Sequence, residues 1–341
     1  MSNAQEKVAG GLPTRELLVT TSPHIRGPED IPRVMWTVVG ALLPAGMVGV
    51  YFFGYYALFI VILSVLAAVL TEAIIQKYLL GQPVSVKDGS AVITGILLAY
   101  VLPPGVPWYI PVVGAVFAIG IVKHAFGGLG NNIWNPALAA RAFLQVAYPA
   151  SINSDWRIIK ESGGILSNIT GMDAITQASP LLKEFGGKTY SYMDLLIGRV
   201  PGCIGETSAI ALMLGGAYLI YRGYVDWRVP AGYIGTVLVL AKLLPARIES
   251  PWANDPIYHL LAGGLMLGAF FMATDMVTSP LTRRGLLIFG IGCGVLTTLI
   301  RFYAAYPEGV CYSILLMNTA TPLIDRFTQP TLLGSASGGK K

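Results

Sequence analysis

The stretch VMWTVVGALLPAGMVGVYFF, Val34 to Phe53, contains no charged side chain. An α-helix of about 20 residues rises about 30 Å, which is the thickness of the hydrocarbon core of a bilayer. The composition of the whole chain agrees, because 54% of the 341 residues are hydrophobic and only 12% are charged. A soluble domain carries about a quarter charged residues. The sequence therefore predicts an integral membrane protein.

Further apolar runs, each bounded by Gly, Pro or charged residues, predict additional membrane spans. The runs lie near residues 34–53, 55–71, 90–103, 109–122, 136–148, 207–221, 229–245, 257–273, 285–300 and 309–320. We therefore expect an all-α polytopic membrane protein with about ten transmembrane helices. Several runs are too short to cross a bilayer alone as drawn.

The Lys and Arg residues of the short connections predict the orientation, because these residues resist translocation. With the N-terminus in the cytoplasm, most of them lie inside, and the short outer connections hold only Lys242, Arg247 and Arg301. The predicted organisation is a cytoplasmic segment 1–33, a first half 34–150, an extracytoplasmic loop 151–206, a second half 207–326 and a cytoplasmic tail 327–341. We expect both termini to be cytoplasmic.

The two predicted halves resemble each other. Residues 95–121 and 268–295 both run from a helix through a proline-bearing linker into a glycine-rich helix. Each is followed by a glycine-bearing turn and an apolar run that contains Asn and Pro. Because five spans are an odd number, a second copy of the half must lie upside down relative to the first. The pattern predicts two inverted five-helix repeats.

Polar residues at membrane depth are costly unless they line a cavity or find partners, which makes them candidates for function. Asp88 in KDGSAVITG either caps a helix or begins a half-helix that faces an anionic group. Asn131, Asn132 and Asn135 in FGGLGNNIWNP indicate a broken helix that lines a cavity. No Gly-Lys-Ser/Thr follows these glycines, which excludes a Walker loop. Asp275 in MATDMVTSP holds a cation, stabilises a turn or caps a helix.

The polar segment TGMDAITQASPL, Thr170 to Leu181, raises a different question, because it lies in the predicted outer loop. Its simplest interpretations are a loop with a turn at Asp173, or a glycosylation acceptor at Asn168. Ser179 has no adjacent His or Lys to activate it, so elementary chemistry gives it no role as a nucleophile. The scattered Cys and His residues predict no metal site.

Six motifs, in this order, resemble one known family: SPHIRG, DGSAVITGILLAYVLPP, FGGLGNNIWNPA, DAITQASPL, MATDMVTSP and YPEG followed by LLMNTATPLID. The family contains the D subunit of the Rnf complex, an ion-translocating ferredoxin:NAD+ oxidoreductase, and the B subunit of the sodium-pumping NADH:quinone reductase. The resemblance extends from about Ser22 to Arg326. It implies ten helices in two inverted halves, an architecture similar to that of urea transporters.

In that family a flavin transferase moves FMN from FAD onto the last hydroxyl of the segment Asp-x-x-Ser/Thr-x-Ala-Thr, as a phosphoester. The matching residues are Asp173, Thr176, Ala178 and Ser179. The resemblance therefore implies covalent FMN on Ser179, on the outer side of the membrane. Two residues depart from the pattern, because Ser179 stands where threonine is usual and Gln177 where glycine is commoner. Serine presents the same oxygen but is less restricted at χ1.

The resemblance also implies the function. The chain would be a subunit of a redox-driven pump in a bacterial or archaeal cytoplasmic (inner) membrane, coupling electron transfer between ferredoxin and NAD+ to translocation of Na+ or H+. Expected partners are the iron–sulfur, flavin and membrane subunits of the complex, the flavin transferase and membrane lipid, but no nucleic acid. A second flavin, riboflavin, is implied, and Asp88, Asn135 and Asp275 are our candidates for ion or flavin contacts.

Other assignments remain open at this level. The short segment before the first span favours the Rnf subunit over the B subunit of the reductase, which usually carries a longer extension. From the residues alone, an inverted-repeat solute transporter or channel without flavin is the main alternative. A structural scaffold for the complex is the third.

Overall fold

The computed structural model describes residues 30–154, 157–158, 175–176, 190–245, 254–304 and 309–329. The regular secondary structure of the described chain is helical, except for one pair of two-residue strands. In the first half the helices are α1 (Ile31–Phe53), α2 (Tyr55–Ile74, continued by a π-helical turn Ile75–Leu79), α3 (Ser90–Tyr100), α4 (Tyr109–Val116, continued by Phe117–His124), α5 (Pro136–Ala147) and α6 (Pro149–Ser154), with a 3-10 turn at Val86–Asp88.

The second half begins after the short helix α7 (Tyr192–Ile197). Its helices are α8 (Ala209–Tyr221), α9 (Arg228–Leu243), α10 (Pro256–Leu261), α11 (Leu265–Leu267, continued by the π-helical segment η4, Gly268–Met272), α12 (Arg283–Tyr303) and α13 (Val310–Thr328). Each of the ten apolar runs overlaps a helix. Within the part of the chain that the structure describes, three helices are long and apolar enough to cross a membrane: Ile31–Phe53, Tyr55–Leu79 and Arg283–Tyr303. The described chain is that of a multi-pass membrane protein.

Two of the runs differ from the helices that they predict. The second run was expected to end at residue 71, but the helix continues to Leu79. It continues because Glu72, the residue that interrupts the run, is buried with a salt-bridge partner rather than exposed at a helix end. The run 257–273 was expected to be a single span, but it breaks after α10. Gly263 has a φ of +70°, which a helix does not allow and which favours glycine.

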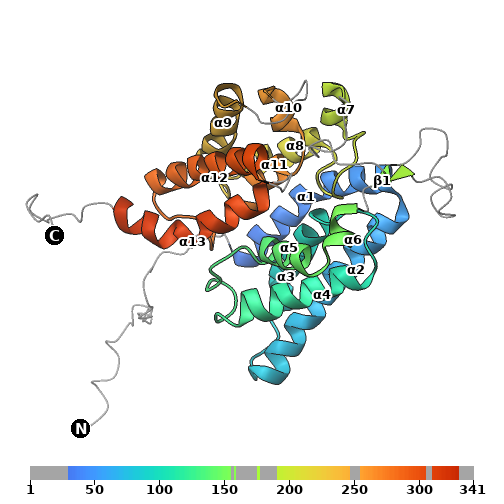
Figure 1. Ribbon diagram of the computed structural model, residues 1–341. Helices are drawn as coiled ribbons and strands as arrows, with labels where there is room; N and C mark the ends of the chain where they lie inside the picture. Colours follow the sequence, from blue (N-terminus) through green and yellow to red (C-terminus); the bar gives the residue numbers. More distant parts are fainter. Residues whose placement is uncertain are drawn as a thin grey trace, which may run out of the picture.

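Each half contains one helix that packs closely against two others of the same half (Figure 1). In the first half α2 packs against α3 and α4, and in the second α9 packs against α10 and α12. Both halves use a glycine for close approach: a Cβ on Gly95 would lie 2.7 Å from Val65 Cα, and one on Gly290 would lie 2.6 Å from Val229 O. Helices α1 and α8, which begin the two halves, lie side by side, and so do α5 and α13.

The described part of the segment between the halves contains one pair of strands and ends against the first half. The strands β1 (Arg157–Ile158) and β2 (Ile175–Thr176) pair antiparallel, with Arg157 opposite Thr176. Before α8, the extended chain enters the first half, where Ile204 N donates to Leu102 O at 3.1 Å and Gly205 N donates to Tyr100 O at 2.9 Å. The start of the second half is therefore built into the packing of the first.

The outer surface of the bundle is apolar. Many large hydrophobic side chains are more than half exposed, among them Leu43, Leu66, Leu214 and Leu316. A soluble protein rarely exposes so much contiguous apolar surface, but hydrocarbon solvates it well. The buried core, by contrast, contains several polar and charged side chains, and these define the candidate site.

Candidate functional site

The predicted flavin-attachment motif lies mostly outside the described residues. Asp173, Ala178 and Ser179 are not among those residues, and Thr176 is described only as part of the backbone of β2. The covalent FMN on Ser179 therefore remains a prediction. The described part of the chain instead reveals a second candidate site, deep between the two halves.

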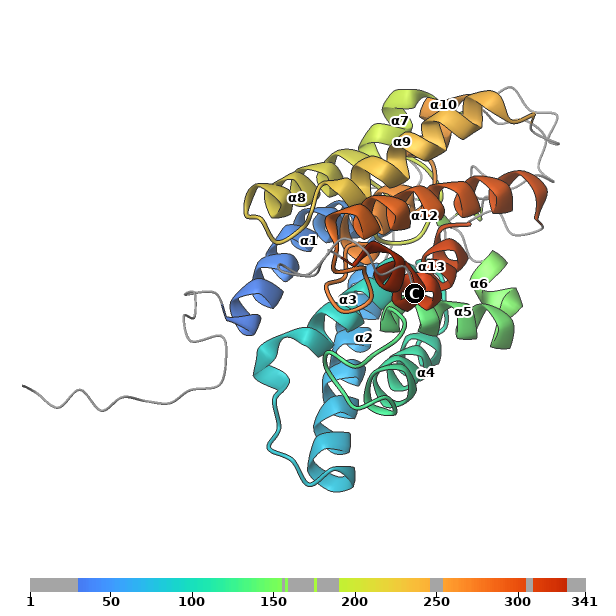
Figure 2. The ribbon, with the colours of Figure 1, turned by 90° about the vertical axis from the view of Figure 1, so that its left-hand side faces the viewer.

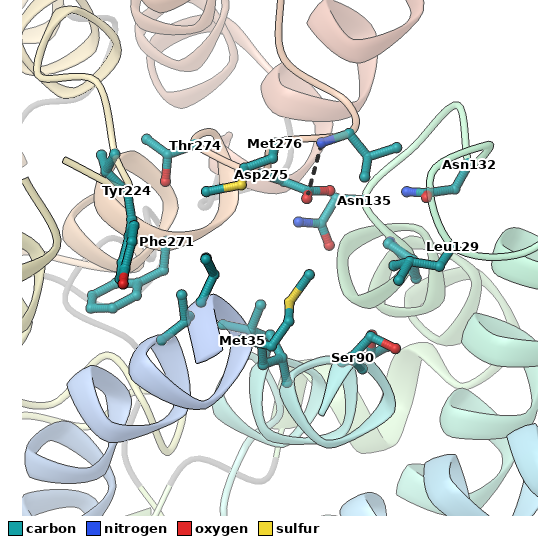
Figure 3. A pocket seen from close by; sticks show the side chains of 18 of the residues that line it. Met35, Ser90, Leu129, Asn132, Asn135, Tyr224, Phe271, Thr274, Asp275 and Met276 are labelled. Carbon is teal, nitrogen blue, oxygen red and sulfur yellow. Dashed lines mark hydrogen bonds between the residues drawn. The ribbon is translucent and has the colours of Figure 1, made fainter. Parts of the chain in front are cut away.

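A cavity of about 110 Å³ lies between the halves (Figure 3). On one side, α1, α3 and the start of α5 line it, and on the other the residues around Tyr224 and the segment from η4 to Val277. Its walls are largely apolar. A few polar side chains converge on it: Ser90, Thr94, Lys123, Asn132, Asn135, Thr274 and Asp275. Apolar walls with a few placed polar groups are typical of a small-molecule site.

Asn135 is one of two predicted contact residues that line this cavity. Its side-chain oxygen caps α5 by accepting from Ala137 N (3.1 Å) and Leu138 N (3.4 Å). The amide nitrogen donates across the boundary between the halves to Met272 O, at 3.3 Å. Asn135 therefore combines a helix cap with a link between the two walls of the cavity.

Asp275 is the second predicted residue on the cavity wall, in the loop that follows η4. Its carboxylate accepts from Val277 N (3.4 Å) and from Thr278 Oγ1 (3.2 Å), so it forms the turn that was one of its three possible roles. Burial raises the pKa of this carboxyl above its usual range, and the two hydrogen bonds oppose the shift. Holding the turn leaves open a further role toward a ligand.

Asp88 does not line the cavity but positions a residue that does. Its carboxylate accepts from both Ser90 N and Ser90 Oγ, each at 2.9 Å, at the start of α3. Ser90 lines the cavity. Asp88 thus lies outside the cavity, next to the N-terminus of α3, and is linked to the cavity through Ser90.

A buried ion pair that we did not predict extends from Ser90. Lys123 Nζ lies 2.6 Å from Glu72 Oε1 and donates to Ser90 Oγ at 2.7 Å. Gln76 donates to the same carboxylate oxygen at 3.3 Å, and His124 Nε2 lies 3.7 Å from it. Lys123 is 2% exposed and Glu72 1%. The sequence signal was present, since Glu72 follows an apolar run, but we used that charge to end the span.

A second unpredicted ion pair joins α5 to the chain that leads into α8. Arg141 in α5 lies 3.4 Å from Glu206, in the chain that precedes α8, and both side chains are buried. The void that adjoins the ion pair has a volume of only about 10 Å³, so packed side chains enclose the ion pair. Arg141 lies inside a predicted span, and an intramembrane charge is a signal that the sequence offered.

The arrangement allows specific chemistry around the cavity. Amide, hydroxyl and carboxylate groups can donate to or accept from the heteroatoms of a planar ligand whose faces contact the apolar wall. Lys123 presents an ammonium group at the wall as half of an ion pair, since the Glu72 carboxylate 2.6 Å away offsets most of its charge. The same oxygens could coordinate a partly hydrated cation.

Residues 18–334 match the model of the NQR2, RnfD, RnfE family. The match covers most of the chain. This protein belongs to the NQR2, RnfD, RnfE family. The resemblance inferred from the six motifs is thereby confirmed.

Two relatives are similar over almost their full length. The D subunit of the Na(+)-translocating ferredoxin:NAD(+) oxidoreductase complex of Acetobacterium woodii is 50% identical over 323 residues, 93% of this chain and 95% of the relative. The D subunit of the proton-translocating ferredoxin:NAD(+) oxidoreductase complex of Clostridium ljungdahlii is 46% identical over 328 residues, 93% of this chain and 96% of the relative. Because their names give different ions, similarity to them does not decide between Na+ and H+.

Proposed function

We propose that this chain is the D subunit of an Rnf-type complex, a membrane component of an ion-translocating ferredoxin:NAD+ oxidoreductase. The observation that carries the proposal is the similarity, over 93% of the chain, to two D subunits of such complexes. The apolar helices fit a membrane subunit, and the cavity between the halves fits a subunit that holds a small ligand. The other subunits of the complex are its partners.

The proposal includes the finer features of the architecture. The ten helical segments form two inverted five-helix repeats, with both termini in the cytoplasm and the loop 151–206 outside. The similar packing around α2 and α9, and the pairing of α1 with α8 and of α5 with α13, support a two-fold relation between the halves. The distribution of Lys and Arg supports the orientation.

The proposed cofactors are FMN, attached covalently to Ser179 by a flavin transferase, and riboflavin, held without a covalent bond in the cavity. The polar groups and apolar walls suit the polar edge and apolar faces of an isoalloxazine ring, but the walls would have to move apart to admit it, because about 110 Å³ is less than the roughly 300–1,000 Å³ of a small-molecule site. Asn132, Asn135 and Asp275 supply groups for that edge, and Phe271 supplies part of the apolar wall. A flavin bound there would supply one- and two-electron transfer.

The residues of the chain would prepare the cavity for such a group. Hydrogen bonds to Glu72 and Ser90 hold the Lys123 ammonium in one position at the wall of the cavity. Asp88 fixes Ser90 in turn. Because a unit charge in a medium of low dielectric interacts by several kcal/mol, a change of charge in the cavity would act on this network and on Asp275. The proposed coupling of redox state to ion occupancy rests on these residues.

Two measurements on the purified complex test the two cofactors separately. Intact mass and in-gel flavin fluorescence of the denatured chain, coexpressed with a flavin transferase, should show an FMN increment in the wild type and none in Ser179→Ala. An increment that survives in Ser179→Ala would move the attachment site, with Thr176 the next residue to test. No increment in either protein would favour a transporter or a scaffold.

The second measurement addresses the cavity. Chromatography of the flavin released by mild denaturation should yield riboflavin from the wild type and from Ser179→Ala, but not from Asn135→Leu. Riboflavin retained by both Asn135→Leu and Asp275→Leu would place the second flavin elsewhere. The cavity would then be left as a candidate for ions.

A further inference from the structure

A groove separate from the central cavity is lined by α1 and α8. These two helices lie side by side (Figure 2). It has a volume of about 540 Å³ and shares no residue with the cavity. The lining residues are Arg33, Trp36, Thr37, Gly40, Ala41 and Pro44 from α1, and Leu214, Gly215 and Tyr218 from α8. Trp36 is 50% exposed and Leu214 66%, so the groove opens to the surroundings of the bundle.

Two glycines create this groove. A Cβ on Gly215 would lie 2.3 Å from Ala41 O, so the two helices touch there through their backbones. A Cβ on Gly40 would have no heavy atom within 4 Å, so the missing side chain leaves open space beside the point of contact. The base of the groove is therefore formed by the backbones of the two helices in contact, and no side chain fills the space above Gly40.

The length of the groove matches one leaflet of a bilayer. The lining residues of α1 extend from Arg33 to Pro44, and eleven steps along a helix rise about 16 Å. Half of a hydrocarbon core of about 30 Å is about 15 Å. A groove of this length suits one acyl chain that reaches from the membrane surface to the midplane.

Charged and aromatic groups mark one end of the groove as the headgroup end. Arg33 is exposed in the first turn of α1. The indole of Trp36 donates to Lys87 O at 3.3 Å, and this bond holds Lys87, a second exposed cationic residue, beside the rim of the groove. Arg222 lies one helical turn beyond Tyr218. Asp30, immediately before α1, is the acidic residue nearest in sequence to Arg33. Trp and Tyr favour the interface, and cations there favour anionic headgroups.

We propose that this groove binds one anionic phospholipid, with an acyl chain over Gly40 and the phosphate beside Arg33. The inference rests on the protein being embedded in a membrane, not on its flavins or its redox role. A transmembrane helix of another subunit is the competing occupant, but it would not require a cationic end. The orientation proposed above places the lipid in the cytoplasmic leaflet.

The test compares the wild-type complex with Gly40→Leu, which fills the groove, and with Gly235→Leu as the matched control. Gly235 is also a helical glycine whose Cβ would have no atom within 4 Å, but it lies in α9, away from the groove. Native mass spectrometry and quantitative lipid extraction should show one tightly held phospholipid fewer in Gly40→Leu only. Arg33→Gln should retain a lipid but lose at least threefold in preference for phosphatidylglycerol over phosphatidylcholine.

Equal lipid retention in Gly40→Leu and in the control, with both complexes intact, would overturn the proposal. A second measurement does not depend on the folding of Gly40→Leu. A photo-crosslinking residue at position 214 of the otherwise wild-type chain should capture phospholipid in cells. Capture of another subunit instead would show that a helix occupies the groove, and it would overturn the lipid site even if Gly40→Leu failed to assemble.

Discussion

The two buried ion pairs differ in their surroundings. Lys123 and Glu72 lie 2.6 Å apart at the wall of a cavity. Lys123 also donates a hydrogen bond to Ser90, and Glu72 accepts one from Gln76. Arg141 and Glu206 lie 3.4 Å apart beside a void that holds at most one water molecule. Only the first pair adjoins the cavity in which we propose a ligand, whereas the second lies among packed side chains. Burial of a charge alone therefore does not identify a functional site.

The largest expected loss of stability follows the removal of Arg141. Arg141→Met removes the cation that lies 3.4 Å from the buried Glu206 carboxylate, and breaking a buried pair costs about 3–5 kcal/mol. We expect a complex that assembles poorly and melts at a much lower temperature, measured by thermal unfolding in detergent. Arg141→Met combined with Glu206→Gln should recover most of the loss. A single variant as stable as the wild type would contradict the structural role.

A smaller loss of stability is expected at the other pair. Lys123→Met also removes a cation, but Glu72 keeps the amide of Gln76, so we expect a cost of about 2 kcal/mol. The functional effect should be the larger one, with loss of non-covalent flavin and of ion uptake into proteoliposomes. Glu72→Gln, which leaves Lys123 in place, is the matched control for flavin retention. If Lys123→Met kept its flavin and its ion uptake, both pairs would be structural.

Asn135 separates stability from ligand binding at one position. Asn135→Ala removes the cap of α5 and should cost about 1 kcal/mol. Asn135→Ser retains a capping oxygen but cannot reach across to Met272 O, so it should melt between Asn135→Ala and the wild type and yet release riboflavin as readily as Asn135→Ala. Thermal melts and flavin content of both variants check this. Unchanged flavin content in Asn135→Ser would remove Asn135 from the ligand site.

The smallest expected change of stability has the opposite sign. Because burial raises the pKa of Asp275, the folded protein holds a proton that the unfolded chain has already lost, and the carboxyl destabilises the fold increasingly as the pH rises through this range. Asp275→Asn should therefore be as stable as the wild type near pH 3 and slightly more stable at pH 7. Melting temperatures at the two pH values measure this.

Ion uptake by Asp275→Asn decides whether this carboxylate has more than a structural role. We expect uptake to fall sharply while the melting temperature holds or rises, which a purely structural residue would not show. Unchanged ion pumping and electron transfer would remove Asp275 from the mechanism and leave it as a turn-forming residue.

The sequence predicted the helical segments well, and its errors have physical causes. The span predicted to end at residue 71 is too short because a charge bounds the apolar run at Glu72, whereas in the structure that charge is paired with Lys123, 51 residues away. The break near Gly263 was missed because glycine also occurs inside transmembrane helices. The sequence singles out Asn135 and Asp275 because polar groups stand out in apolar surroundings, and both line the cavity. Their position on one cavity could not be read from residues 140 positions apart.

By itself, the sequence determined that the chain is a membrane protein, where its helices lie and which motifs place it near the Rnf D subunits. These properties depend on runs of neighbouring residues, and the cost of transferring a run to hydrocarbon is set by its own side chains. Only the tertiary structure decided which charges neutralise each other, which polar groups share the cavity and where the outer groove lies. Such features depend on distances in space, which local composition does not encode.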